Sequence, residues 1–251
     1  MKTLDGIVLV TVGLALASGA GLLAGCSSDA QAQTASAPGC AGLPTNAELT
    51  RVIKDVVHGD TNGGGGAEMW GGVVSQDGVV CATAFSSTDR AGSKLATRAI
   101  ALAKANTSAS FSTTTGAVPT GGLYPAVQPG GPIFGLESGN PVDPAVAYGG
   151  DATLYGTASD PAIGKKIGGT ITFGGGLPLY DSAGKLVGGI GVSGDSSCAD
   201  HIIAWEMRSA LELDKTPSLD NLTIGAGAHP DCGMGSAALI AALPTAYPPT
   251  P

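Results

Sequence analysis

The chain has 251 residues, of which 43% are hydrophobic and 4% aromatic, and it carries a formal net charge of −8 at pH 7. This length suits one domain, and the hydrophobic content is ample for a core built mainly of Val, Ile, Leu and Ala. An acidic chain without a cluster of Lys and Arg lacks the surface that binds nucleic acid, and anionic lipid would repel it.

Residues 1–25 have the pattern of an export signal. Lys2 precedes an apolar run at 7–23 that is short for a membrane span, and small residues close the run. Its end, Leu23-Ala24-Gly25-Cys26, resembles the bacterial lipobox, in which a peptidase cuts before a cysteine that carries diacylglycerol. We therefore expect a lipoprotein anchored through Cys26 at the periplasmic face of the cell envelope. Because Ser27 rather than Asp follows the cysteine, we expect the outer membrane in a Gram-negative cell.

Residues 26–40 are expected to form a flexible, lipid-anchored tether, because Ser, Ala, Gln and Thr dominate them. A single domain follows at 41–233, and residues 234–251 form a Pro-rich tail. No later apolar run is long enough to cross a membrane, so the lipid anchor is the membrane contact that we expect.

The domain begins with a predicted helix at 45–58, which Thr45 or Asn46 can cap and whose apolar residues repeat at helical spacing. Two β-rich runs follow at 69–75 and 79–86, and the Asp-Gly sequence between them is a hairpin signal.

A second helix is predicted at 93–111, with a stripe of small apolar residues of the kind that packs closely on a sheet. The stretch at 116–169 is rich in Gly and Pro and has no clear periodicity, so we interpret it as an insertion that runs as ordered, extended chain.

β character returns in the second half of the domain, at 170–173, 177–180 and 185–193. The last of these runs is apolar on both sides and contains glycines, which indicates a central strand that another backbone approaches closely. Asp195 or Ser196 can cap a third helix that reaches about residue 213, and the chain is expected to be irregular after Pro217.

Four cysteines besides Cys26 lie in the domain, at positions 40, 81, 198 and 232. An even number in an oxidising compartment indicates two disulfides, for which three pairings exist. We favour Cys40 with Cys232, which would join the two ends, and Cys81 with Cys198. There is no Cys-x-x-Cys motif, so neither a zinc ribbon nor a thioredoxin-like redox site is predicted. Cys198 and His201 could in principle bind a metal, but a disulfide at Cys198 would close that option, so no metal ligands are assigned.

The order helix, hairpin, helix, insertion, hairpin, helix predicts an α+β fold with an antiparallel central sheet and helices packed on it. A doubly wound parallel sheet fits worse, because hairpin turns are too short for crossover connections.

Four segments give this pattern a family likeness: the hairpin at 76–82 with Trp70 before it, the helix segment 104–109, and two glycine-rich segments at 173–179 and 187–194. In these segments the sequence resembles the GlcG/HbpS-like haem-binding family, once called haem-degrading domains. The resemblance covers about 49–213 outside the insertion. It implies a PAS- or profilin-like sandwich of two or three layers, binding of haem or another small ligand, and assembly into homo-oligomers.

His201 is the first candidate for ligand binding, because haem iron takes a histidine readily and this one opens the third helix beside Asp200. Lys104 and Thr107 lie three residues apart near the end of the second helix and can offer a cation and a hydroxyl to an acidic ligand. A structural role is the alternative for each: a hydrogen-bonded core position for His201, and for Lys104 a cation that complements the helix C-terminus. His229 has no visible partner.

Three functions remain open. The leading hypothesis is an exported lipoprotein that binds a small ligand, with haem or a related tetrapyrrole as the first candidate. The second is an enzyme that acts on a small organic acid through His201 and Asp200. The third is a non-catalytic sensory or scaffold domain. We favour binding over catalysis, and the segment 191–195 lacks the final glycine that a serine-hydrolase nucleophile elbow requires.

Overall fold

The computed structural model describes residues 37–59 and 62–249, which belong to one compact unit, Ala35–Pro251. The predicted signal peptide, Cys26 and most of the tether lie outside the described residues. Among the described residues, no helix has the length and apolar character needed to cross a membrane.

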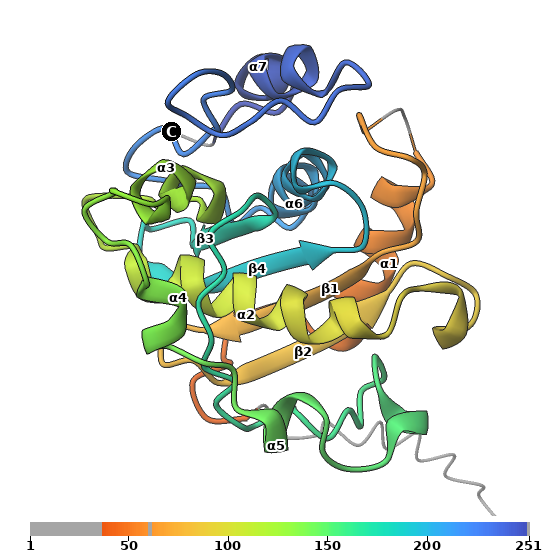
Figure 1. The fold of residues 1–251 in the computed structure, drawn as a ribbon. Helices are drawn as coiled ribbons and strands as arrows, with labels where there is room; N and C mark the ends of the chain where they lie inside the picture. The colour runs from red at the N-terminus through yellow and green to blue at the C-terminus, as the bar shows by residue number, and fades with distance from the viewer. Residues whose placement is uncertain (1–36, 60–61, 250–251) are drawn as a thin grey trace, which may run out of the picture. The chain divides into compact units, whose positions relative to one another are not determined.

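The core of the unit is a four-stranded sheet in the order β2-β1-β4-β3, in which every neighbouring pair is antiparallel (Figure 1). Its strands are β1 (Trp70–Ser75), β2 (Val80–Phe85), β3 (Gly176–Tyr180) and β4 (Leu186–Ser193). Because β1 pairs with β4, two hairpins that lie far apart in the sequence join into one sheet. The predicted α+β fold with an antiparallel central sheet is confirmed.

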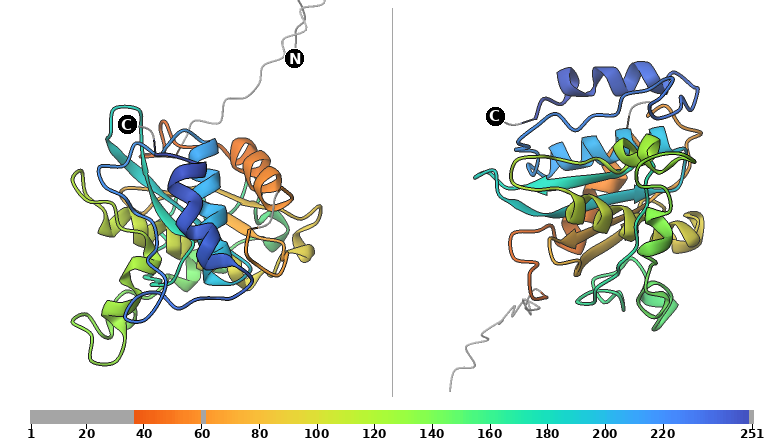
Figure 2. Two further views of the ribbon diagram at one scale, coloured as in Figure 1. Left: turned by 90° about the horizontal axis from the view of Figure 1, so that it is seen from above. Right: turned by 60° about the vertical axis from the view of Figure 1, so that its left-hand side comes forward.

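Helices cover both faces of this sheet (Figure 2). Side chains alternate along a strand, and a Cβ on Gly72 would meet Leu102 of α2 (Ala96–Phe111), whereas one on Gly71 would meet Ile53 and Met207. These two belong to α1 (Asn46–Val57) and α6 (Ser197–Ala210), which therefore share the other face.

Glycines in β4 allow α2 to lie unusually close to the sheet. A Cβ on Gly191 would overlap the carbonyl oxygen of Ala101, and one on Gly189 would overlap that of Ala105. The helix also has small side chains that permit this close packing: Ala101, Ala105 and Ala109 are all buried. The close approach predicted from the glycines of this strand is thus confirmed.

A capping box begins α1. The hydroxyl of Thr45 accepts a hydrogen bond from the Glu48 N–H at 3.3 Å, and the Glu48 carboxylate accepts one from the Thr45 N–H at 2.8 Å. Thr45, one of the two predicted caps, satisfies the free amides of the first turn in this way. At α6 the cap is Ser196, whose hydroxyl accepts from the Ala199 N–H. Asp195 instead accepts from the amides of Gly65 and Ala67.

We expect Thr45→Ala to lower the free energy of unfolding by about 1 kcal/mol, because the first turn of α1 loses its cap. Urea denaturation of the folded domain measures this. Thr50→Ala is the matched control in the interior of the same helix, where no capping bond exists. Equal losses in the two variants would contradict the assignment.

The predicted insertion at 116–169 contains short helical turns instead of continuous extended chain: η2 (Thr120–Leu123), α3 (Tyr124–Val127), α4 (Leu136–Gly139), α5 (Pro144–Ala147) and η3 (Ala152–Leu154). Arg98 of α2 binds this segment through three contacts. Its guanidinium forms a buried ion pair with Asp160, donates to the Ala147 carbonyl at 2.6 Å and lies 4.0 Å from the ring centre of Tyr155.

Two predicted elements are wrong. Residues 170–173 form no strand, because their amides bond to side chains, such as Ile171 N–H to the Thr107 hydroxyl at 2.9 Å. After Pro217 the chain is not irregular throughout, since α7 (Ser236–Ala246) packs on α6. No side chain caps the start of this helix, and Pro244, usually a helix breaker, lies inside it.

The disulfides join Cys40 to Cys81 and Cys198 to Cys232, so the pairing that we favoured is wrong. The first bond connects the segment before α1 to β2, on which α1 packs. The second connects the first turn of α6 to the loop before α7, which packs on α6. Each bond therefore links neighbours in space within one half of the sequence, and neither joins the two ends.

Candidate functional site

Lys104 and Asp200, two of the predicted ligand-binding residues, form a buried ion pair. Lys104 reaches from α2 past Gly175, where β3 is about to begin, to Asp200 on α6. Its Nζ lies 2.6 Å from Asp200 Oδ2 and donates to the Val192 carbonyl at 3.0 Å, while Asp200 Oδ1 accepts from the Asp195 N–H at 3.1 Å. The pair thus ties together the helices on opposite faces of the sheet.

Burial acts on both charges of this pair. Loss of solvent lowers the pKa of Lys104 and raises the pKa of Asp200, and the attraction between the two groups opposes each change. With both polar ends occupied by protein partners, neither side chain is available to a ligand in this conformation.

Thr107 is equally engaged. Its hydroxyl donates to the Ala103 carbonyl at 2.7 Å and accepts from the Ile171 N–H at 2.9 Å. The side chain is buried and holds the segment before β3 against α2. In this conformation Thr107 therefore has a structural role.

His201 is fully buried beneath the C-terminal part of the chain. Its Nε2 lies 3.2 Å from the Asn221 side-chain oxygen, which fixes the proton on Nε2, and Nδ1 has no hydrogen-bond partner among the described residues. The ring packs on Trp205, 6.1 Å between ring centres. Burial lowers the pKa of His201 to about 3, against a smaller opposing effect of the hydrogen bond to Asn221, so the ring is neutral.

We expect the free energy of unfolding to decrease as the pH decreases below about 7, because of His201. Below about pH 6.5 the unfolded chain binds a proton at this residue, whereas the folded chain does so only near its pKa of about 3. The contribution is about 2 kcal/mol between pH 7 and pH 5. Urea denaturation at both pH values should show this loss in the wild type and not in His201→Gln; equal losses in both proteins would contradict it.

As they lie, the four predicted residues do not fit a haem. His201 Nδ1 carries the lone pair suited to iron, but this atom is buried inside the protein, and Nε2 is engaged by Asn221. Two cavities of about 250 and 350 Å³ lie beside α1 and the end of α6, and none of the four residues lines either. A ligand role for these residues stays a prediction, and it requires the cover over His201 to move.

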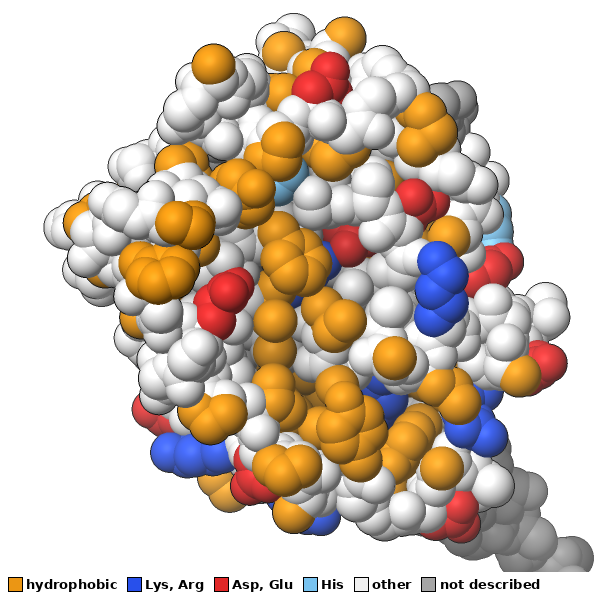
Figure 3. Space-filling view, viewed as in Figure 1, with side chains coloured by type: hydrophobic (Ala, Val, Ile, Leu, Met, Phe, Trp, Pro, Cys, Tyr) orange, Lys and Arg blue, Asp and Glu red, His pale blue; other side chains and the backbone are white. Residues whose placement is uncertain are grey.

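Apolar side chains gather on the surface of the face that carries α2 (Figure 3). Exposed large hydrophobic residues include Leu95 just before α2, Phe134 before α4 and Tyr148 after α5, of which Phe134 is 66% exposed. Exposed apolar surface of this kind marks interaction sites for ligands or other chains.

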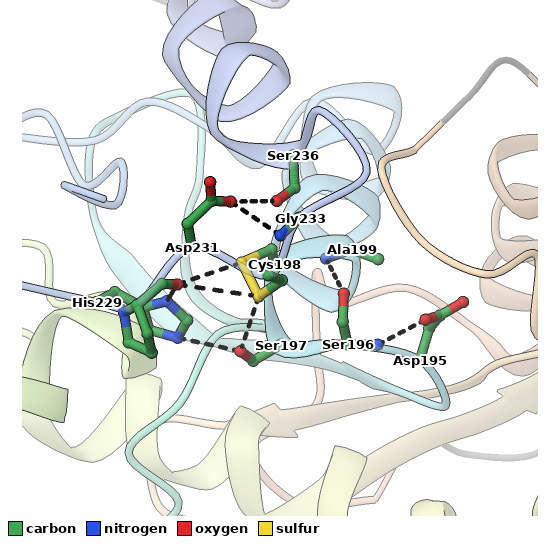
Figure 4. The surroundings of a disulfide bond; sticks show 11 residues. Asp195, Ser196, Ser197, Cys198, Ala199, His229, Asp231, Gly233 and Ser236 are labelled. Carbon is green, nitrogen blue, oxygen red and sulfur yellow. Dashed lines mark hydrogen bonds between the residues drawn. A yellow bond between two sulfur atoms is a disulfide. The ribbon is translucent and has the colours of Figure 1, made fainter. Parts of the chain in front are cut away.

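The sequence interpretation missed one group, which lies around the Cys198–Cys232 disulfide (Figure 4). His229 does have partners: its Nδ1 lies 2.9 Å from the Pro230 carbonyl, and its Nε2 lies 3.1 Å from the Ser197 hydroxyl. Burial lowers the pKa of His229 below the usual value for histidine. The signal that could have revealed this group is the short spacing between His229 and Cys232.

A family model described as "Haem degrading protein HbpS-like" matches residues 66–208. This range runs from just before β1 into α6 and includes all four strands and α2. No curated protein matches the chain.

Similar solved structures include the PduOC:heme complex, at 26% identity, with a TM-score of 0.44 and coverage of 65% of this chain and 89% of that one. The Klebsiella pneumoniae protein ORFY matches at 19% identity, with a TM-score of 0.43 and coverage of 72% and 94%. HbpS matches at 19% identity, with a TM-score of 0.42 and coverage of 66% and 86%.

Proposed function

Because the chain belongs to the family of HbpS-like haem-degrading proteins, we propose that it binds haem or a related tetrapyrrole. The match over 66–208 is the observation that carries this proposal, and the sequence resemblance had already pointed to the same family. The apolar surface on the side of α2 supports it, since a tetrapyrrole is a flat, largely apolar molecule that buries its faces against such side chains; His201, which belongs to α6 and is buried, does not lie on that surface.

The test is a titration of the mature protein with haemin, followed by its Soret band. We expect a saturable shift at micromolar haemin, and its absence would contradict haem binding. Iron-free protoporphyrin is the matched ligand control: equal affinity for both would show that the protein packs the macrocycle and provides no iron ligand. Native mass spectrometry of the same sample reports haem per chain and the number of chains, which tests the homo-oligomer that we also propose.

Two histidine variants locate the iron ligand. His201→Ala should abolish the iron-dependent part of the shift if the cover over His201 moves on binding. His58→Ala is the control, since this side chain is half exposed beside Glu68. An unchanged shift in His201→Ala would exclude His201 as the ligand and leave haem binding itself untouched.

The alternative of an enzyme that uses His201 and Asp200 gains no support from the described residues. Asp200 is engaged by Lys104, and His201 is neutral and covered. A general acid and base must reach the substrate, and neither group does so in this conformation.

We further propose that the protein is exported and lipid-anchored through Cys26. Its N-terminal pattern supports this, and the two disulfides among the other four cysteines are typical of an oxidising compartment. Metabolic labelling with radioactive palmitate in a bacterial host should mark the wild type and not Cys26→Ser. Ser27→Ala is the control and should keep the label; label retained in Cys26→Ser would contradict the anchor.

A further inference from the structure

We propose that Cys198, Cys232 and His229 form, once their disulfide is reduced, a binding site for a thiolate-preferring metal ion, with Zn²⁺ as the first candidate. The ligand atoms of the three residues lie within 4.8 Å of one another. Two thiolates on a tetrahedral zinc ion are about 3.8 Å apart, given zinc–sulfur distances of about 2.3 Å. A disulfide bond is about 2.0 Å long, so after reduction the two sulfur atoms need to separate by only about 2 Å to share one ion with His229.

His229 is oriented as a metal-binding histidine is. Its Nδ1–H donates to the Pro230 carbonyl at 2.9 Å, so the lone pair is on Nε2. That nitrogen faces the Ser197 hydroxyl at 3.1 Å, and the same hydroxyl lies 3.6 Å from Cys232 Sγ (Figure 4). Metal-ligating histidines usually donate their other ring N–H to a carbonyl or carboxylate in this way, which fixes the tautomer and the ring orientation.

The two cysteines differ in access, which sets the order of reduction. Cys198 is buried in the first turn of α6, whereas Cys232 is partly exposed in the loop before α7. A thiolate of a dithiol reductant attacks Cys232 Sγ, the disulfide bond breaks, and Cys198 leaves as a thiolate that the amides of the helix start favour. The second thiol of the reductant then releases Cys232 and forms the reductant's own disulfide, so two electrons pass to the protein.

Charge balance favours a dication in this place. Two thiolates and a neutral imidazole together neutralise Zn²⁺, so no net charge is buried next to Cys198 and His229, which are 0% and 2% exposed. Binding releases the protons that the two thiols still carry. Three protein ligands leave the fourth tetrahedral position to water or another small ligand.

The loop that carries Cys232 has room to adjust. Asp231, Gly233, Met234 and Gly235 are exposed, and a Cβ on either glycine would meet nothing within 4 Å. The sulfur atoms can therefore separate to the distance that a shared ion requires without displacing α6.

The other disulfide provides an internal control. Within the described residues, Cys198, His229 and Cys232 are the group of metal-ligating side chains that the structure brings together, and Cys40 and Cys81 belong to no such group. Both pairs yield thiols on reduction, so only the presence of His229 and its surroundings distinguishes them.

The test is a titration of the mature protein with Co²⁺ under anaerobic conditions, after reduction with dithiothreitol and removal of the reductant. We expect the reduced wild type to bind one equivalent, with sulfur-to-cobalt charge-transfer bands and the visible bands of a tetrahedral ion, and Zn²⁺ to displace it. The oxidised protein should show neither. Cys40→Ser/Cys81→Ser should bind as the wild type does, and Cys198→Ser/Cys232→Ser should not bind.

His229→Ala keeps both disulfides and so tests the ligand without altering the oxidised fold. We expect its affinity for Co²⁺ to fall at least about 10-fold to 100-fold, since loss of even an outer partner of a ligand has that effect. Circular dichroism checks that each reduced protein is folded. The proposal is overturned by a reduced wild type without thiolate bands, whether folded or not, by equal binding in His229→Ala, or by loss of binding in Cys40→Ser/Cys81→Ser.

Discussion

Lys104→Met should lower the free energy of unfolding by about 3–5 kcal/mol, because it leaves the buried Asp200 carboxylate without its partner. The Asp195 N–H would remain as its hydrogen-bond donor, which does not compensate for a lost charge 2.6 Å away. Denaturation by urea at pH 7 measures the loss. Since burial already raises the pKa of Asp200, the loss should shrink as the pH falls and the carboxyl becomes protonated.

Two further variants separate the charge effect from the loss of side-chain packing. Lys104→Met/Asp200→Leu removes both charges and should recover most of the stability, since apolar pairs of similar volume often replace buried ion pairs without loss. Arg51→Met breaks the ion pair of Arg51 with Asp55, whose side chains are 64% and 66% exposed, and should change stability by less than about 1 kcal/mol. A loss in Lys104→Met no larger than in Arg51→Met would contradict the buried pair.

Gly191→Ala should destabilise the fold by about 3 kcal/mol or more, the upper end of the effect of overpacking. The added methyl group would overlap the backbone carbonyl of Ala101, and a backbone atom of α2 cannot move aside as a side chain does. The helix must instead lift away from β4 along its length. Thermal unfolding and the exposure of α2 amides to hydrogen exchange measure the two parts of this effect.

The matched control is Gly139→Ala, because a Cβ at Gly139 would meet nothing within 4 Å. Its backbone is not in the left-handed region, so alanine should be tolerated there with little change. Similar losses in the two variants would show that the cost is a general property of glycine replacement and not the approach of α2 to β4.

Hydrophobic spacing and turn chemistry were enough to predict the framework of this fold. The Asp-Gly turn after β1, the Thr45 cap of α1 and the glycines of β4 are local features, and each of them predicted an element that the structure contains. Short turns also require antiparallel neighbours, so the sheet type followed from the chain alone. What they could not give is the pairing of β1 with β4, because it joins two hairpins that lie far apart in the sequence.

Features that depend on distant partners were not predictable in this way. Nothing near Lys104 or Asp200 in the sequence shows that the two residues, 96 positions apart, meet in the core. The pairing of the four cysteines likewise depends on which segments pack together. α7 was not predicted because no side chain caps its start and Pro244, usually a helix breaker, lies inside it.

His201 was predicted to bind a ligand because it follows the central strand at the start of a helix. A histidine at the start of a helix can face a ligand or the core, and here the C-terminal segment, which lies beyond the matched range, turns it into a core residue. His229 was passed over because Ser197, which lies 32 positions away in the sequence, becomes its neighbour only after the chain has folded.

The bond between Cys40 and Cys81 also has a mechanical consequence. It closes a loop with a sequence separation of 41, within which α1 and β1 lie. Tension applied to the chain ahead of Cys40 therefore passes through the bond into β2, at one edge of the sheet, and bypasses α1. A domain pulled by its leading end resists at the sheet itself, and breaking this one bond would let α1 be drawn out first.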